Sequence, residues 1–374
     1  MSHAELTGQT PDDSILESAL EGQGLAAEAT WLAESEESES QITAAELADL
    51  ESKPKTKAQI ALDRFVCLLP TLFGLAAMGE YLYLPNAVSW KTTYTYPVLV
   101  GVLTAAVFVA FVASCVNRRV FSWLRYKAPF YSLVFVILLV YDVLTTKTGT
   151  LLRPFFPNVD EVLNAMVDDR TYLLDSTQHS LVLLFSGYFS GVIVGLLTGI
   201  ACGYSKKVDY WIAPFRKLLG AIPSTTWIPV VMVIATSLFQ GSVFIIGLGV
   251  WFAVTIATIT GIRHIDKTYY EAARSLGAKG YQLVLRIAIP SAIPSIFQGM
   301  IQAMSSACTA LMVAEMIGVQ SGLGWYITWQ KNFAEYDKMY AAIVVICLIF
   351  VAVNAAMRLI QRRLLRWQEG AIEQ

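Results

Sequence analysis

The feature that most constrains this chain is a series of apolar runs, each long enough to cross a membrane. A helix needs about 20 apolar residues to span roughly 30 Å of hydrocarbon. Only 15% of the residues are charged, against about a quarter in soluble globular domains. We therefore predict an all-α polytopic membrane protein with eight transmembrane helices. These cover residues 62–84, 97–116, 128–146, 177–202, 220–238, 243–262, 290–317 and 337–358.

The N-terminal segment has a different composition from the rest of the chain. Residues 1–52 hold thirteen acidic residues, no Lys or Arg and few aromatic residues. Such a segment cannot bury enough apolar surface to offset the entropy lost on ordering. We predict that residues 1–60 form an acidic, disordered tail, with a docking or regulatory segment as the alternative. Residues 61–126 are expected to hold two additional transmembrane helices.

Basic residues set the expected orientation in the membrane. Lys and Arg are enriched in cytoplasmic loops near membrane spans. A basic collar precedes the first span, which places the N-terminus in the cytoplasm, and an even number of spans returns the C-terminus to the same side. The loops assigned to the cytoplasm then carry most of the basic residues. This orientation also places the polar residues 266–294 in the cytoplasm. The collar consists of Lys53, Lys55, Lys57 and Arg64.

The fifth predicted span contains two prolines, Pro223 and Pro229, that bracket a polar segment. Proline breaks the hydrogen-bond ladder of a helix, and a broken helix at membrane depth is tolerated inside protein or beside water. The segment could therefore line a translocation path, or it could be a kink satisfied by neighbouring hydroxyl groups. Its candidate path residues are Ser224, Thr225 and Trp227.

The seventh predicted span is unusually polar for a membrane helix. Most of its polar residues have the i, i+4, i+7, i+8 spacing of one helix face, which predicts that they point together into a bundle or cavity. They are candidate contacts for a polar solute, although hydrogen bonds between helices would explain them equally well. Glu315, near the outer end, is expected to be partly exposed to water. The set is Gln298, Gln302, Ser305, Ser306, Thr309 and Glu315.

Small residues mark one face of the fourth span. Glycines at every fourth position leave that face with almost no side chains, which permits close packing between membrane helices. We predict that this face is a packing surface. The glycines are Gly187, Gly191, Gly195, Gly199 and Gly203.

The polar insert at 266–294 predicts a short polar helix from Lys267 to Leu276, a turn at Gly277, and a helix that resumes from Tyr281 to Ile287, before Pro290. Its residues also follow a family pattern: E-A-A, three residues, G, nine residues, I-x-L-P. The order resembles the EAA loop of bacterial binding-protein-dependent ABC transporter permeases, with Ile289 in place of the Leu. An ordinary amphipathic interfacial loop is the alternative. The matching residues are Glu271, Ala272, Ala273, Gly277, Ile287 and Pro290.

The resemblance extends over residues 127–368, which it implies form the permease core with six spans. The segments LLRPFFPNVDEVLNAM, IPSTTWIP, VAEMIG, GLGWYI and RLIQRRLLRW look like the nitrate, sulfonate, taurine and bicarbonate branch. The implied fold is that of a type I importer. The implied cargo is a small solute such as a sulfonate, nitrate or similar oxyanion.

The resemblance also implies the partners of this chain. Two cytoplasmic ATPase subunits would dock on the EAA loops and would hold the ATP and Mg²⁺. A second permease subunit, expected to be another copy, would complete the path, and an extracytoplasmic solute-binding protein would deliver cargo. The expected location is the bacterial cytoplasmic (inner) membrane, with both termini in the cytoplasm. Membrane lipid would surround the spans, and no nucleic acid is expected as a partner.

The absence of catalytic motifs limits the other functions. The chain has no G-x-x-x-x-G-K-[ST] sequence, so a P-loop ATPase must be a separate chain and no cofactor is expected here. Its three histidines, His3, His179 and His264, are too scattered for a metal site. They also do not suit an intramembrane hydrolase, so we do not expect an enzyme. An ion-coupled secondary transporter remains the alternative function.

Overall fold

The computed structural model describes residues 57–87 and 93–365, and every regular element in these ranges is a helix. The acidic tail predicted for residues 1–60 lies outside the described residues, apart from its last four. Those four begin helix α2 (Lys57–Tyr83). The predicted all-α fold is therefore confirmed for the described part of the chain.

Within the described ranges, seven helical segments are each long and apolar enough to cross a membrane. An eighth span is counted if Lys206–Ala221 and Ser224–Ile234, which are bent by 92° relative to each other, cross as one. The predicted fifth span, 220–238, includes this bend. The helix is interrupted there because Pro223 has an extended ψ of 139°. The seven segments are Ala58–Tyr83, Thr95–Val116, Arg118–Lys147, Arg170–Tyr204, Leu238–Arg263, Tyr281–Ile317 and Tyr336–Leu364.

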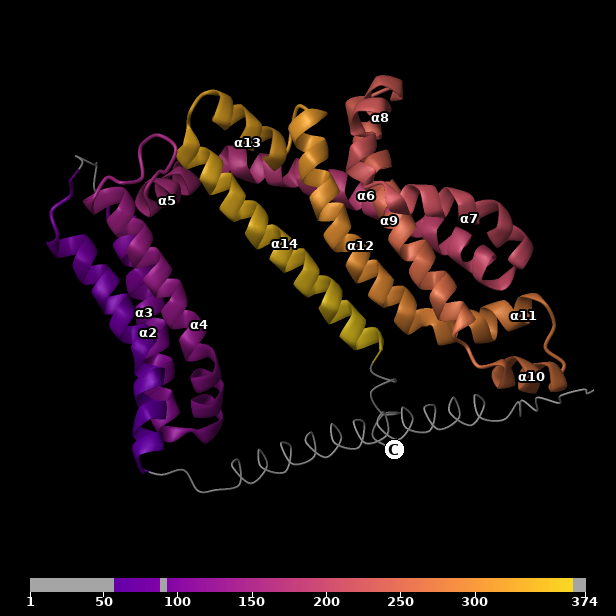
Figure 1. The fold of residues 1–374 in the computed structure, drawn as a ribbon, viewed down its shortest axis with the longest axis horizontal. Coiled ribbons are helices and arrows are strands. Elements are labelled where there is room, and N and C mark those ends of the chain that lie inside the picture. Colours follow the sequence, from indigo (N-terminus) through magenta and orange to yellow (C-terminus); the bar gives the residue numbers. More distant parts are fainter. Residues whose placement is uncertain (1–56, 88–92, 366–374) are drawn as a thin grey trace, which may run out of the picture.

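The first three helices, α2, α3 (Thr95–Val116) and α4 (Arg118–Asp142), pack together as a bundle on one side of the molecule (Figure 1). A short π-helix, η1 (Val143–Lys147), continues α4. The sequence-based division at residue 127 assigns the third span to the permease core and stays a prediction; in the structure this span, α4, packs with α2 and α3. The buried residues of α4 face α2 and α3, and Arg125 pairs with Asp63 across α2 and α4.

Helix α5 (Val159–Asp168) connects this bundle to the remaining helices. The Asp160 carboxylate accepts hydrogen bonds from the backbone N–H groups of Thr93 at 3.0 Å and Tyr96 at 2.9 Å. Asp160 thus pairs backbone N–H groups at the start of α3. The N-cap residue of α3, Tyr94, makes no side-chain hydrogen bond to them. On its other side α5 packs against α14 (Tyr336–Leu364).

The central pair of helices is α6 (Arg170–Tyr204) and α9 (Leu238–Arg263). The glycine face of α6 lies directly against α9, as its spacing predicted. A Cβ atom at Gly191 would lie 2.5 Å from the Gly247 carbonyl oxygen, and one at Gly199 would lie 2.6 Å from Thr258 Cβ. The two backbones can approach this closely only because these positions carry no side chain.

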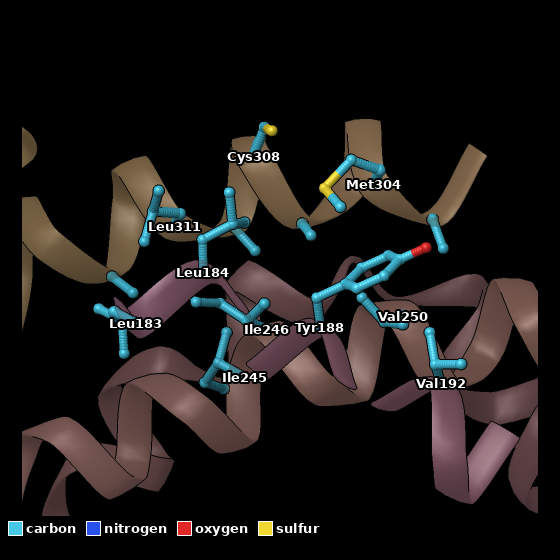
Figure 2. Close-up of a cluster of buried hydrophobic side chains, with 14 of the residues drawn as sticks. Leu183, Leu184, Tyr188, Val192, Ile245, Ile246, Val250, Met304, Cys308 and Leu311 are labelled. Atoms are coloured by element: carbon cyan, nitrogen blue, oxygen red, sulfur yellow. The ribbon is translucent and has the colours of Figure 1, made fainter. Parts of the chain in front are cut away.

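Helix α12 (Ile289–Ile317) covers the α6–α9 pair and completes the main apolar core. Figure 2 shows Leu184 and Tyr188 of α6 lying between Ile246 of α9 and Met304 of α12. The Tyr188 hydroxyl donates a hydrogen bond to the Met300 carbonyl oxygen at 3.1 Å. The buried phenol hydroxyl therefore has a hydrogen-bond partner inside the apolar core.

Shorter helices lie around this core. Helix α7 (Lys206–Ala221) is followed by the 3₁₀ turn η2 (Ser224–Trp227) and helix α8 (Ile228–Ile234). Helix α13 (Leu323–Asn332) connects α12 to α14. Between α9 and α12 the chain forms α10 (Lys267–Ser275), α11 (Tyr281–Leu283) and the π-helix η3 (Val284–Ala288).

Candidate translocation path and coupling segment

A cavity of about 290 Å³ lies beside the turn between α7 and α8. Ser224 and Thr225 line it from the turn, and Ser306 and Thr309 line it from α12. The structure therefore brings together candidate path residues from the fifth and seventh predicted spans. Their hydroxyl groups can both donate and accept hydrogen bonds.

The position of this turn depends on a glycine in α9. A Cβ atom at Gly249 would lie 2.9 Å from the Ser224 hydroxyl oxygen, so a larger residue there would press on the turn. Pro223 keeps the backbone extended just before it. Together these residues place a polar turn against otherwise apolar helices.

A second cavity, of about 750 Å³, lies between α9 and α12. Gln298, Gln302 and Ser306 line it from α12, and Phe252 and Thr260 line it from α9. Ser306 lines both cavities. The polar face predicted for the seventh span is therefore a cavity-lining face over much of its length.

Other candidate path residues lie elsewhere. The Ser305 hydroxyl lies 3.4 Å from Asn354 Oδ1 of α14, and Ser305 is not among the residues lining either cavity. Trp227 packs against the core cluster, and its indole N–H has no partner in the described part of the chain. Trp227 lies in the same turn as Ser224 and Thr225, and Ser305 lies in the same helix as Ser306, but both contact other neighbours than the cavity residues do.

Glu315 differs most from its expected position. It is fully buried, although the sequence predicted partial exposure, and it lines neither cavity. The backbone N–H of Gly324 donates a hydrogen bond to Glu315 Oε2 at 2.8 Å, at the start of α13. A carboxylate at a helix N-terminus is stabilised by the exposed N–H groups there. Its position indicates a role in holding α13.

Sequence reasoning missed the contribution of α9 to the cavities. Phe252 and Thr260 belong to a nearly uniform apolar helix, which carries no periodic polar signal. Only their proximity to the polar face of α12 in the folded chain identifies them. Ser306, by contrast, belongs to the polar periodicity that the sequence displays.

The predicted coupling residues lie on and after α10. Glu271 and Ala272 are exposed and Ala273 is partly exposed, and α10 has no buried residue. Tyr270 reaches back to pack against the apolar cluster formed by the end of α9, η3 and the start of α12. The Thr268 N–H donates to the Asp266 carboxylate at 3.0 Å, which caps α10 and holds the pKa of Asp266 below its usual value.

The turn after α10 depends on glycine. Gly277 has φ +85° and Gly280 has φ +35°, a region that residues with a Cβ atom rarely adopt. Ile287 then lies in η3, and Pro290 lies in the first turn of α12, which continues directly from η3. The helix–turn–helix predicted from the sequence is present, with a π-helical turn before Pro290.

Comparison with known proteins gives the family. A family model described as the binding-protein-dependent transport system inner membrane component matches residues 191–366. SsuC of Bacillus subtilis (strain 168), named as an aliphatic sulfonates transport permease, is 30% identical over 184 residues, which are 49% of this chain and 67% of SsuC. This chain belongs to that family of ABC importer permeases. The matched region contains both cavities and α10.

Two further similarities accompany this match. The permease is 27% identical to the taurine transport system permease TauC of Escherichia coli (strain K12) over 232 residues, which are 60% of this chain and 84% of TauC. Among solved structures, an inward-facing MetNI methionine ABC transporter has a TM-score of 0.46 and 20% identity, covering 52% of this chain and 97% of that one. As a permease subunit, the protein is a transport component and not an enzyme.

Proposed function

We propose that this permease moves a small oxyanion, such as a sulfonate or nitrate, into the cytoplasm, driven by ATP hydrolysis on a separate chain. The observation that carries the coupling proposal is that α10 is attached to the described bundle chiefly through Tyr270. A helix that buries none of its own residues has its surface free for another protein.

The segment at 266–290 has the surface expected of such a contact. Leu276 is 88% exposed and Tyr281 is 72% exposed, and they flank the Gly277 turn. Large exposed apolar side chains beside charged ones are typical of protein-binding surfaces. In this proposal the ATPase binds Glu271 and the Gly277 turn. Closure of the ATPase dimer then moves α12 through η3.

The chemistry of the two cavities supports an oxyanion as cargo. The polar side chains lining them include Ser, Thr and Gln, which can donate hydrogen bonds to anionic oxygens. No Lys or Arg is among the lining residues of these two cavities. A neutral path of this kind would bind an anion weakly and release it, leaving most selection to a solute-binding protein. The names of SsuC and TauC favour a sulfonate.

The assembly in this proposal contains two copies of the permease, two cytoplasmic ATPases that bind ATP and Mg²⁺, and an extracytoplasmic solute-binding protein. The permease lies in the cytoplasmic membrane with both termini inside. The distribution of Lys and Arg among the loops supports this orientation.

Reconstitution with the ATPase and binding protein tests the proposal. Charge reversal by Glu271→Lys should abolish ATP-driven uptake and reduce co-purification of the ATPase. Asp168→Lys is the matched control, because Asp168 is also exposed but lies on α5, far from α10 (Figure 1). Uptake that continues without ATPase, driven by an ion gradient, would instead support a secondary transporter.

A further inference from the structure

The N-terminal bundle encloses a group of ionisable side chains that belongs to neither the cavities nor the coupling segment. Glu80 of α2, Asp142 of α4 and Tyr96 of α3 meet at the end of the bundle beside α5. Their exposed fractions are 7%, 1% and 0%. Lys147 of η1, whose side chain is 7% exposed, completes the group. Buried charges at membrane depth are costly and usually mark a function.

Lys147 supplies one positive charge, but its hydrogens are directed elsewhere. Its ammonium donates to the Leu84 carbonyl oxygen at 2.7 Å and to Asn86 Oδ1 at 2.8 Å. Glu80 Oε1 lies 3.8 Å away, within ion-pair range but beyond hydrogen-bond distance. The ammonium therefore offsets one negative charge without donating a hydrogen bond to Glu80.

Several oxygens of the group lack a hydrogen-bond partner in the described part of the chain. These are both carboxyl oxygens of Glu80, Asp142 Oδ2 and the Tyr96 hydroxyl. The other oxygen, Asp142 Oδ1, accepts from the Thr146 hydroxyl at 2.8 Å. Buried polar atoms rarely remain unpaired, so the three unpaired carboxyl oxygens indicate a missing hydrogen.

The charges lead to the same conclusion. The carboxyl groups of Glu80 and Asp142 lie close enough for the charge of one to act on the other. Two adjacent carboxylates in an apolar interior cannot both remain ionised, and they commonly share one proton. With both ionised and Lys147 charged, the group would bear a net negative charge. One proton makes it neutral and provides the missing donor.

We propose that Glu80 and Asp142 hold a single proton between them, so that the N-terminal bundle contains a buried proton-binding site. The O–H of one carboxyl group donates to the unpaired oxygen of the other, and Tyr96 lies against the pair. No group of three or more His, Cys, Asp or Glu side chains suited to a metal ion occurs in the described ranges. The Lys147 ammonium also repels a second cation at this site.

The other ionisable groups packed around the site are engaged elsewhere. Asp160 of α5 caps the start of α3 through Thr93 and Tyr96 N–H groups. The Tyr81 hydroxyl donates to the Thr93 carbonyl oxygen at 3.1 Å, and its ring lies 5.6 Å from the Lys147 ammonium. Loss of the shared proton therefore leaves an uncompensated charge inside the bundle. The bundle should lose stability as the pH rises through the point at which this proton leaves.

Infrared spectroscopy of the full-length permease in lipid nanodiscs tests the site directly. The parent protein should show the carbonyl band of a protonated carboxylic acid near neutral pH, shifted in heavy water. Glu80→Gln and Asp142→Asn should each remove it, because the remaining carboxylate pairs with Lys147. Asp168→Asn, at an exposed position, should keep it. Absence of the band from the parent protein would overturn the proposal.

Thermal unfolding as a function of pH provides a second measurement. The parent protein should lose stability as the pH rises above the ordinary titration range of carboxyl groups, until the shared proton leaves, and Glu80→Gln should flatten this dependence. Equal pH dependence in both proteins would contradict a shared proton. Stability that follows the sodium concentration at constant pH would also overturn the proposal, in favour of a bound metal cation.

Discussion

Glu315 of α12 holds the first turn of α13, because its carboxylate accepts the Gly324 N–H at 2.8 Å inside a fully buried site. The fit around the carboxylate is close. A Cβ atom at Gly322 would lie 2.2 Å from Glu315 Oε1, and one at Gly324 would lie 2.8 Å from Glu315 Cβ. Ser180 of α6 completes the contact, since its hydroxyl accepts the Leu323 N–H at 2.9 Å. Glu315 thus joins α12 to α13, and Ser180 joins α6 to the same turn of α13.

Removing this side chain should destabilise the permease. Glu315→Ala leaves the Gly324 N–H buried without a partner, which costs about 1–3 kcal/mol, and also leaves a cavity. Glu315→Gln retains an acceptor oxygen and should cost less. Thermal unfolding of both variants in the same detergent checks this order. Equal stability of Glu315→Ala and the parent would show that the hydrogen bond has no structural role.

The turn after α10 allows a test of the coupling segment by backbone conformation alone. A Cβ atom at Gly277 would meet nothing within 4 Å, but φ is +85° there. Gly277→Ala should therefore cost about 1–2 kcal/mol for the left-handed conformation, or roughly tenfold in ATPase affinity. Gly79→Ala is the matched control, because Gly79 also has free space but no positive φ. Similar ATPase binding by both variants would argue against docking on this turn.

The sequence predicted those features that depend on local pattern. Hydrophobic runs located most spans, four-residue glycine spacing identified the α6 packing face, and Gly277 with Pro290 outlined the turn and re-entry to α12. Each of these signals is contained within one helix or turn. They could therefore be read without knowledge of which helices are neighbours.

Features that depend on contacts between residues far apart in the chain could not be predicted from the sequence. Glu315 was a candidate path residue because it is an acidic residue in an apolar span, and the sequence gives no sign that α13 folds back onto it. The grouping of α4 with α2 and α3 depends on side chains such as Asp63 and Arg125, which pair only in the folded chain. Phe252 and Thr260 of α9 likewise became candidate path residues only beside α12.

The glycine face of α6 should not tolerate even one methyl group at its centre. Gly191→Ala would place Cβ 2.5 Å from the Gly247 carbonyl oxygen, so α6 and α9 must separate. Overpacking of this kind costs about 1–3 kcal/mol. Gly101→Ala is the control, since its Cβ would lie 3.9 Å from Met78 Sδ in ordinary contact. Thermal unfolding should show a lower midpoint for Gly191→Ala only, and an unchanged midpoint would refute close packing.

Two adjacent serines distinguish the translocation path from mere helix packing. Ser306 lines both cavities, whereas Ser305 faces Asn354 of α14. If the cavities carry the solute, Ser306→Val removes a hydrogen-bond donor from the path, and uptake should fall about tenfold for the loss of about 1.4 kcal/mol. Ser305→Val makes the same chemical change one residue away and should leave uptake near the parental level. Solute uptake by proteoliposomes with equal permease content measures both variants, and a larger loss for Ser305→Val would move the path from the α9 side of α12 to the α14 side.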